Sequence, residues 1–115
     1  MPFAYAIVDD LAVVRGYGPV DFATWHEVMR QVVDDPRFTD GMPILLDASE
    51  VANALQPGEG AMIAIRWRAL APKSRGAILT AGAAELAVAQ QIEGITDQRL
   101  RAFTGREAAL AWLRS

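Results

Sequence analysis

The sequence contains no cysteine and a single histidine, and these two absences exclude several kinds of site. Without cysteine there can be no disulfide bond, no thiolate metal ligand and no cysteine nucleophile. The one histidine, His26, cannot form a multi-histidine metal site, and as a general base it would have no nucleophile to serve. We therefore predict no catalytic residue, no metal site and no cofactor.

Excess positive charge and long apolar runs are also lacking. Eleven Lys and Arg residues stand against 14 Asp and Glu, which gives a formal net charge of -3. A nucleic-acid-binding protein needs clustered excess positive charge, so we predict no nucleic-acid partner. No stretch approaches the roughly 20 apolar residues that span a bilayer, and the first residues lack the basic region of a signal peptide. We expect a cytoplasmic protein with no stable membrane insertion.

What is present is enough hydrophobic material for one core. The chain has 115 residues, of which 52% are hydrophobic, and chains of roughly 100 to 150 residues commonly form one domain. No linker-like tract, repeat or low-complexity run interrupts it. We place residues 1–115 in a single domain.

Hydrophobic periodicity predicts nine elements in the order ββαβαβαβα. The runs 3–8 and 11–16 are rich in β-branched and aromatic residues and flank Asp9-Asp10, a pattern typical of an antiparallel hairpin. Helical patterns and short apolar strands then alternate. The predicted helices follow Asp21, begin at Pro57, follow Gly82 and follow Thr104, and the predicted strands between them are 44–46, 77–79 and 99–103.

Particular residues predict where the helices begin and end. Asp21 is an N-cap residue for the first helix, and Pro36 prevents its continuation. Gly94 is a plausible C-cap residue for the third helix. Thr104 and Glu107 have the spacing of a capping box, which would start the last helix.

The predicted fold class is α/β, with a mixed, mostly parallel five-stranded sheet. An N-terminal antiparallel hairpin opens it, and each later helix is a right-handed crossover, so the helices lie mainly on one face. The strands 44–46 and 77–79 are apolar on both faces, which leaves the second face partly open. We expect a second copy of the chain to cover it, and therefore a symmetric homodimer.

Three segments carry a resemblance to a known family. They are Val32–Phe38 with the following Gly41, then Ile44–Val51, and finally Phe103–Leu113. Together they resemble small stand-alone bacterial STAS-like proteins, which are similar in fold to anti-sigma-factor antagonists and to the cytoplasmic domains of sulfate transporters. The element order matches over nearly the whole chain. The resemblance implies a domain that binds a regulatory protein partner and does not catalyse a reaction.

The resemblance also implies a phosphorylation switch, from which this sequence departs. Antagonists of this fold are switched at a serine that follows an aspartate just before the second helix. Here the segment 54–60 reads Ala-Leu-Gln-Pro-Gly-Glu-Gly and offers no hydroxyl group. Ser49 lies earlier and does not match the switch position. We predict that regulation by phosphorylation at the usual position is absent.

Polar residues at the ends of the predicted strands mark a candidate ligand or partner site. Carboxyl ends of neighbouring parallel strands meet at one edge of a sheet, where open α/β sheets bind ligands. The candidates at this edge are Tyr17, Asp47, Ser49, Thr80 and Thr104. An alternative is that Asp47 and Ser49 only satisfy loop N–H groups and that Thr104 only caps its helix.

Two functions remain open at this point. The first is a non-enzymatic STAS-like interaction module that lacks the phosphorylatable serine. The second is a carrier or sensor of a small apolar or anionic ligand near the carboxyl edge of the sheet. An apolar cavity enclosed by Trp25 and Trp67 would favour the carrier, whereas a solid core with an exposed apolar patch would favour the interaction module.

Overall fold

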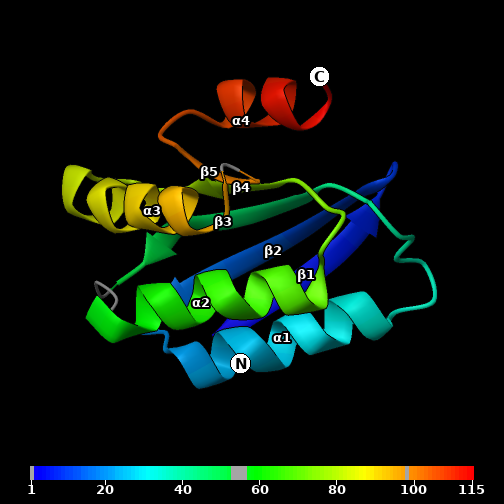
Figure 1. The fold of residues 1–115 in the computed structure, drawn as a ribbon, viewed down its shortest axis with the longest axis horizontal. Coiled ribbons are helices and arrows are strands. Elements are labelled where there is room, and N and C mark those ends of the chain that lie inside the picture. Colours follow the sequence, from blue (N-terminus) through cyan, green and yellow to red (C-terminus); the bar gives the residue numbers. More distant parts are fainter. Residues whose placement is uncertain (1, 53–56, 98) are drawn as a thin grey trace.

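A computed structural model describes residues 2–52, 57–97 and 99–115. Its elements follow the predicted order ββαβαβαβα, with strands and helices alternating after the opening hairpin (Figure 1). The bounds are β1 (Phe3–Val8), β2 (Leu11–Gly18), α1 (Phe22–Asp34), β3 (Ile44–Val51), α2 (Pro57–Leu70), β4 (Gly76–Leu79), α3 (Ala83–Ile95), β5 (Leu100–Phe103) and α4 (Arg106–Leu113).

The five strands form one mixed sheet in the order β1-β2-β3-β4-β5. β1 and β2 are antiparallel, and each later neighbouring pair is parallel. Helices α1, α2 and α3 pack on one face, and the short α4 lies on the other (Figure 1). The predicted fold class is confirmed, including the concentration of helices on one face.

Successive side chains of the central strands point to opposite faces of the sheet, so the protein has two separate hydrophobic clusters. Ile44 and Leu46 of β3 point into the large cluster under α1, α2 and α3, whereas Leu45 belongs to a smaller cluster with Ala109 and Leu113 of α4. The apolar run 44–46 is therefore buried on both faces, as predicted. Part of the cover on the second face comes from the chain's own α4, where we had expected a second copy of the chain.

Most of the predicted helix ends agree with the structure, including the start of α2 at Pro57, and two differ. The Asp21 side chain accepts a hydrogen bond from the Thr24 amide at 2.8 Å, and α1 ends at Asp34, before Pro36. Gly94 is not a C-cap residue, because α3 continues to Ile95 and Thr96 takes that position.

The predicted capping box at the start of α4 is also wrong. The N-cap residue is Gly105, one residue later than Thr104, and it makes no side-chain hydrogen bond.

Two strands are longer than their apolar runs indicated. β2 continues to Gly18 and β3 to Val51, and their register shifts between Arg15 and Tyr17. Ser49 therefore lies within β3, whereas the predicted strand ended at residue 46. Within the described residues, no helix has the length and apolar character needed to cross a membrane.

Candidate functional site

A row of four paired residues crosses the sheet near the carboxyl ends of the parallel strands. The register places Arg15 of β2 beside Asp47 of β3, Asp47 beside Leu79 of β4, and Leu79 beside Phe103 of β5. Leu79 and Phe103 pack in the cluster under α4, so this row faces the side of the sheet that carries α4. Asp47 is the acidic member of the row.

Asp47 is a buried carboxylate, only 6% exposed, with both oxygens engaged. Oδ1 accepts hydrogen bonds from the backbone N–H of Ser49 at 3.0 Å and from the Ser49 hydroxyl at 2.5 Å. Oδ2 lies 3.6 Å from Nε of Arg15 and 3.5 Å from Nη1 of Arg106. A buried charge of this kind is tolerated because it is paired and hydrogen-bonded.

The arrangement fastens three elements together. Arg15 comes from β2, Asp47 and Ser49 from β3, and Arg106 from the first turn of α4. The cluster contains no histidine and no second buried carboxylate, and its one hydroxyl already donates to Asp47. Its evident chemical role is to hold the start of α4 over the sheet.

The other predicted site residues do not all reach this cluster. Tyr17 is 38% exposed, and the Arg15 guanidinium lies 5.6 Å from its ring centre, so Tyr17 is an indirect neighbour of Asp47. Thr80 is buried at 3% exposure, and its hydroxyl has no partner in the described structure. Thr104 is exposed and neither caps α4 nor contacts Asp47. The structure thus brings Asp47 and Ser49 together and leaves Thr80 and Thr104 apart from them.

Arg15 and Arg106 are the members that the sequence analysis missed. Arg15 follows the apolar run of β2, and Arg106 follows the predicted helix start. An arginine at such positions is common on a solvated surface. Arg15 is identified as a partner of Asp47 by the register of β2 against β3, and Arg106 by the position of α4 over the sheet.

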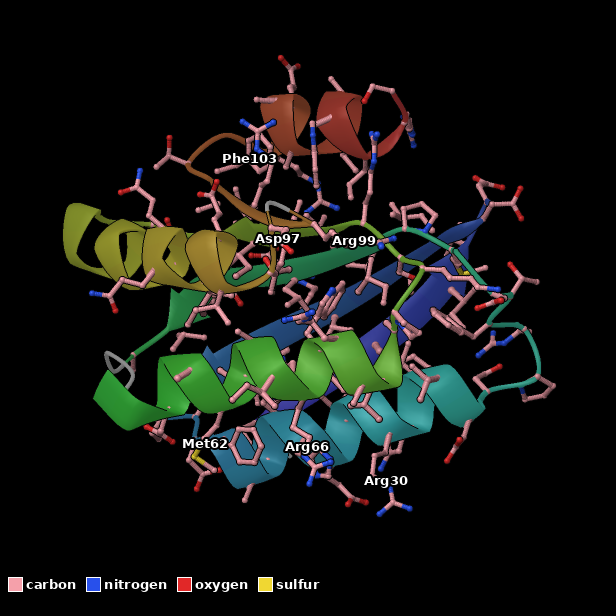
Figure 2. The ribbon with its side chains drawn as sticks, viewed as in Figure 1. Arg30, Met62, Arg66, Asp97, Arg99 and Phe103 are labelled. Atoms are coloured by element: carbon pink, nitrogen blue, oxygen red, sulfur yellow. The ribbon has the colours of Figure 1, made fainter. Side chains whose placement is uncertain are left out.

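A second candidate surface lies on the outer side of α2. Met62 is 47% and Ile65 63% exposed, and Arg66 and Ala69 are exposed beside them at helical spacing. Figure 2 shows Met62 and Arg66 on the side of α2 that faces away from the sheet. The inner side of the same helix buries Ile63 and Trp67. Exposed apolar side chains grouped in this way are typical of a contact surface.

The start of α2 is connected to α1. Oε2 of Glu59 accepts a hydrogen bond from the backbone N–H of Phe22 at 2.8 Å. That N–H belongs to the first turn of α1 and has no partner within its own helix. Glu59 is therefore a fixed carboxylate that caps a neighbouring helix. The segment 53–56, which includes most of the predicted switch position, lies outside the described residues.

His26 lies against an aromatic ring. It is half-buried on α1 and stacks on Phe22, with ring centres 5.6 Å apart. In the part of the chain that the structure describes, no group of three acidic or histidine side chains could hold a metal ion.

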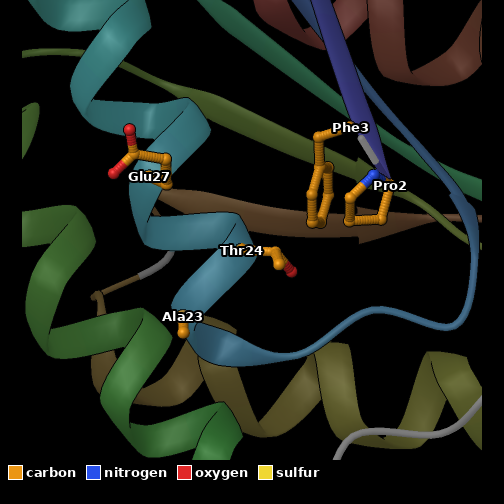
Figure 3. A pocket seen from close by; sticks show the side chains of 5 residues that line it. All are labelled: Pro2, Phe3, Ala23, Thr24 and Glu27. Atoms are coloured by element: carbon orange, nitrogen blue, oxygen red, sulfur yellow. The ribbon is translucent and has the colours of Figure 1, made fainter.

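The two tryptophans proposed to enclose a cavity are instead part of the packed core. Trp25 is 5% and Trp67 1% exposed, and both belong to the large cluster. A shallow hollow of about 170 Å³ lies elsewhere, between the start of β1 and the first turns of α1, lined by Pro2, Phe3, Ala23, Thr24 and Glu27 (Figure 3). A solid core together with the exposed face of α2 is the combination that favours an interaction module.

An aspartate outside these surfaces has a strongly shifted pKa. Arg37 donates to Asp35 from its side chain at 3.0 and 2.9 Å and from its backbone N–H at 2.9 Å, and this holds the pKa of Asp35 well below its usual range. The Tyr5 hydroxyl donates to the same carboxylate at 2.9 Å, and this hydrogen bond raises the pKa of Tyr5. The group fastens β1 to the end of α1.

Comparison with known proteins identifies the fold. An anti-sigma factor antagonist from Mycobacterium paratuberculosis superposes with a TM-score of 0.70 at 18% identity, over 98% of this chain and 93% of that one. An uncharacterised protein with a SpoIIAA-like fold from Shewanella loihica gives a TM-score of 0.65 at 14% identity, covering 96% and 91% of the two chains. The unphosphorylated anti-sigma factor antagonist SpoIIAA gives 0.60 at 14% identity over 98% of each chain.

The chain therefore has the SpoIIAA-like, or STAS-like, fold of the anti-sigma factor antagonists, and the predicted resemblance is confirmed at the level of the fold. No model of a protein family matches the sequence, and no curated protein matches it either.

Proposed function

We propose that this protein is a non-enzymatic, cytoplasmic regulatory module that binds a protein partner through the outer face of α2. The observation that carries the proposal is the exposed pair Met62 and Ile65 on a STAS-like fold. Apolar side chains scattered singly on a surface are ordinary, whereas large apolar side chains grouped at adjacent exposed positions are typical of a site that a partner covers.

The chemistry of this face defines the kind of partner. Met62 and Ile65 supply apolar area, and Arg66 stands next to them on the same side of the helix. Methionine and arginine are both enriched in the centre of protein interfaces. The matching surface has an apolar pocket next to an acidic side chain. Anti-sigma factors are the class to test, because two of the three structural neighbours described above are antagonists of such proteins.

We further propose that the interaction is constitutive. A phosphorylatable antagonist gains roughly -1.5 to -2 units of charge at the start of the second helix when it is modified. This sequence has Gln56-Pro57-Gly58 there, without a hydroxyl group. The nearby carboxylate of Glu59 is permanent and is occupied by the Phe22 amide. Ser49 is a poor substitute, because its hydroxyl donates to the buried Asp47.

A calorimetric titration with purified anti-sigma factors of the source organism tests the α2 surface. We expect Ile65→Glu to weaken binding at least tenfold, because it places a charge in the apolar contact. Ile95→Glu is the matched control, since Ile95 is a 39% exposed isoleucine on α3. Equal affinities of the wild-type protein and Ile65→Glu would contradict the proposal, as would the absence of binding to every such factor.

A further inference from the structure

The two edge strands of the sheet, β1 and β5, differ in whether charged side chains lie at the edge. On β5, the Glu93 side chain accepts a hydrogen bond from the backbone N–H of Ala102 at 3.1 Å, and Arg101 lies 3.8 Å from the same carboxylate. Charged side chains at an edge prevent a further strand from adding there. The opposite edge is β1, Phe-Ala-Tyr-Ala-Ile-Val, which has no charge, no proline and no bulge.

The phase of the hairpin decides which groups of β1 face outward. Asp9 and Asp10 have φ values of 52° and 62°, as in a two-residue type I′ turn, so Val8 and Leu11 form the closing hydrogen-bonded pair. Hydrogen-bonded pairs then recur at every second residue, and the bond from the Tyr17 amide to the Pro2 carbonyl at 2.7 Å has this phase.

Phe3, Tyr5 and Ile7 are therefore the residues whose backbone N–H and C=O groups point away from β2. In the described part of the chain, no side chain or backbone group bonds to these outward groups. An uncharged edge whose outward backbone groups are unbonded is a template for pairing with another strand.

We propose that β1 pairs antiparallel with β1 of a second copy of this chain, around a two-fold axis at Tyr5. In this register Tyr5 lies opposite Tyr5 of the partner subunit, and Phe3 lies opposite Ile7 of the partner subunit. The three outward residues are symmetric about Tyr5, so every free N–H finds a carbonyl group. The two sheets become one sheet of ten strands, and this symmetry closes the assembly at two copies.

α1 lies beside this edge. Glu27 lines the hollow beside Phe3, and the Tyr5 hydroxyl reaches Asp35 at the end of α1, so α1 and β1 run side by side in the same direction (Figure 3). The two-fold axis at Tyr5 therefore places the two copies of α1 antiparallel to each other on the same face of the joined sheet.

The register can be tested with paired substitutions on the open face of the sheet. Ala4 and Ala6 are exposed, and in the proposed dimer Ala4 lies opposite Ala6 of the partner subunit, at the 4.5 to 5.5 Å separation typical of cross-strand neighbours. Ala4→Lys/Ala6→Lys places like charges opposite each other twice. Ala4→Glu/Ala6→Lys places opposite charges there, with the same number of substitutions at the same positions.

Sedimentation equilibrium at tens of micromolar is expected to show a dimer for the wild-type protein and for Ala4→Glu/Ala6→Lys. The dissociation constant of Ala4→Lys/Ala6→Lys should rise at least tenfold. A wild-type monomer at these concentrations would overturn the proposal, and so would equal dissociation constants for the two double variants.

If the lysine variant does not fold, the outward N–H groups supply a second test. Ile7→Pro removes one outward N–H of β1 without removing a hydrogen bond to β2, so it should raise the dissociation constant of the dimer at least tenfold. An unchanged dissociation constant would overturn the proposal. The interface does not involve the outer face of α2, so the dimer can fail while the proposed function stands, and the reverse also holds.

Discussion

Two buried threonines differ in whether their hydroxyl groups form hydrogen bonds. Thr96 is 1% exposed, and its hydroxyl donates to the Ile92 carbonyl at 3.0 Å and accepts from the Leu100 amide at 3.3 Å. Thr80 is 3% exposed and its hydroxyl has no partner in the described structure. Thr96 links the end of α3 to β5, whereas the hydroxyl of Thr80 links nothing.

We predict opposite effects of the same substitution at these two positions. Thr96→Val should lower the free energy of unfolding by about 1–2 kcal/mol, because it leaves the Leu100 amide buried without an acceptor. Thr80→Val should leave it unchanged or raise it by up to about 1 kcal/mol, because an unpaired buried hydroxyl is removed. Urea denaturation measures both. A loss at Thr80 as large as at Thr96 would show that the Thr80 hydroxyl has a partner.

The Asp35 carboxylate predicts how stability depends on pH. Its pKa in the folded protein is depressed by Arg37, so the stabilisation is present above the unfolded pKa and is lost as pH falls towards the folded value. Between pH 7 and pH 3 the wild-type protein should therefore lose more free energy of unfolding than Asp35→Asn. Asp34→Asn, at an exposed neighbouring aspartate, is the control and should behave as the wild type. If the free energy of unfolding fell by the same amount between pH 7 and pH 3 in the wild type and in Asp35→Asn, the Asp35 carboxylate would not be the source of this pH dependence.

The helices and strands themselves, and their order along the chain, were predicted correctly from the sequence, but several of their first and last residues were not. Periodicity was sufficient for all nine elements, and Asp21 marked the start of α1, because these signals are local. The prediction that Gly94 ends α3 was wrong, because an exposed glycine can remain inside a helix when the residues around it favour the helix. The extension of β3 to Val51 depends on pairing with β2, which is not a local property.

The two sides of α2 show a further limit of prediction from sequence. Ile63 and Ile65 are the same residue type two positions apart, yet Ile63 is 5% and Ile65 63% exposed. Apolar residues occur on both sides of this helix, so its periodicity does not identify the buried side. For the same reason the exposed face of α2 could be found only in the structure, as could the two arginines that pair with Asp47.

Two glycines in regular elements should respond in opposite ways to alanine. Gly94 lies in α3 with open space around it, so Gly94→Ala should raise the free energy of unfolding by about 0.5–1 kcal/mol through helix propensity. At Gly76 in β4, an added methyl group would overlap the Trp67 ring and Leu100, so Gly76→Ala should cost about 3 kcal/mol. Thermal and urea denaturation of both variants measure these shifts. A neutral Gly76→Ala would contradict the packing of Trp67 against β4.

In the whole molecule, the Asp47 cluster, the outer face of α2 and the edge strand β1 lie in different places and have different roles. The Asp47 cluster fixes α4 on one face of the sheet, α2 presents an apolar surface on the other side, and β1 forms an uncharged edge. Because the edge and the outer face of α2 do not overlap, a dimer formed through β1 leaves both copies of α2 free. Each chain of the dimer should then bind one partner protein, and the stoichiometry of the calorimetric titration measures this.

We propose above that this STAS-like module makes a constitutive contact with a protein partner. The most direct measurement is the affinity for the anti-sigma factor it binds, determined before and after the two proteins are incubated with ATP and Mg²⁺, with the intact mass of the chain recorded in parallel. We predict an unchanged mass, and dissociation constants before and after the incubation that agree within twofold. A mass increase of one phosphate, together with a tenfold or greater change in affinity that Ser49→Ala abolishes, would contradict it.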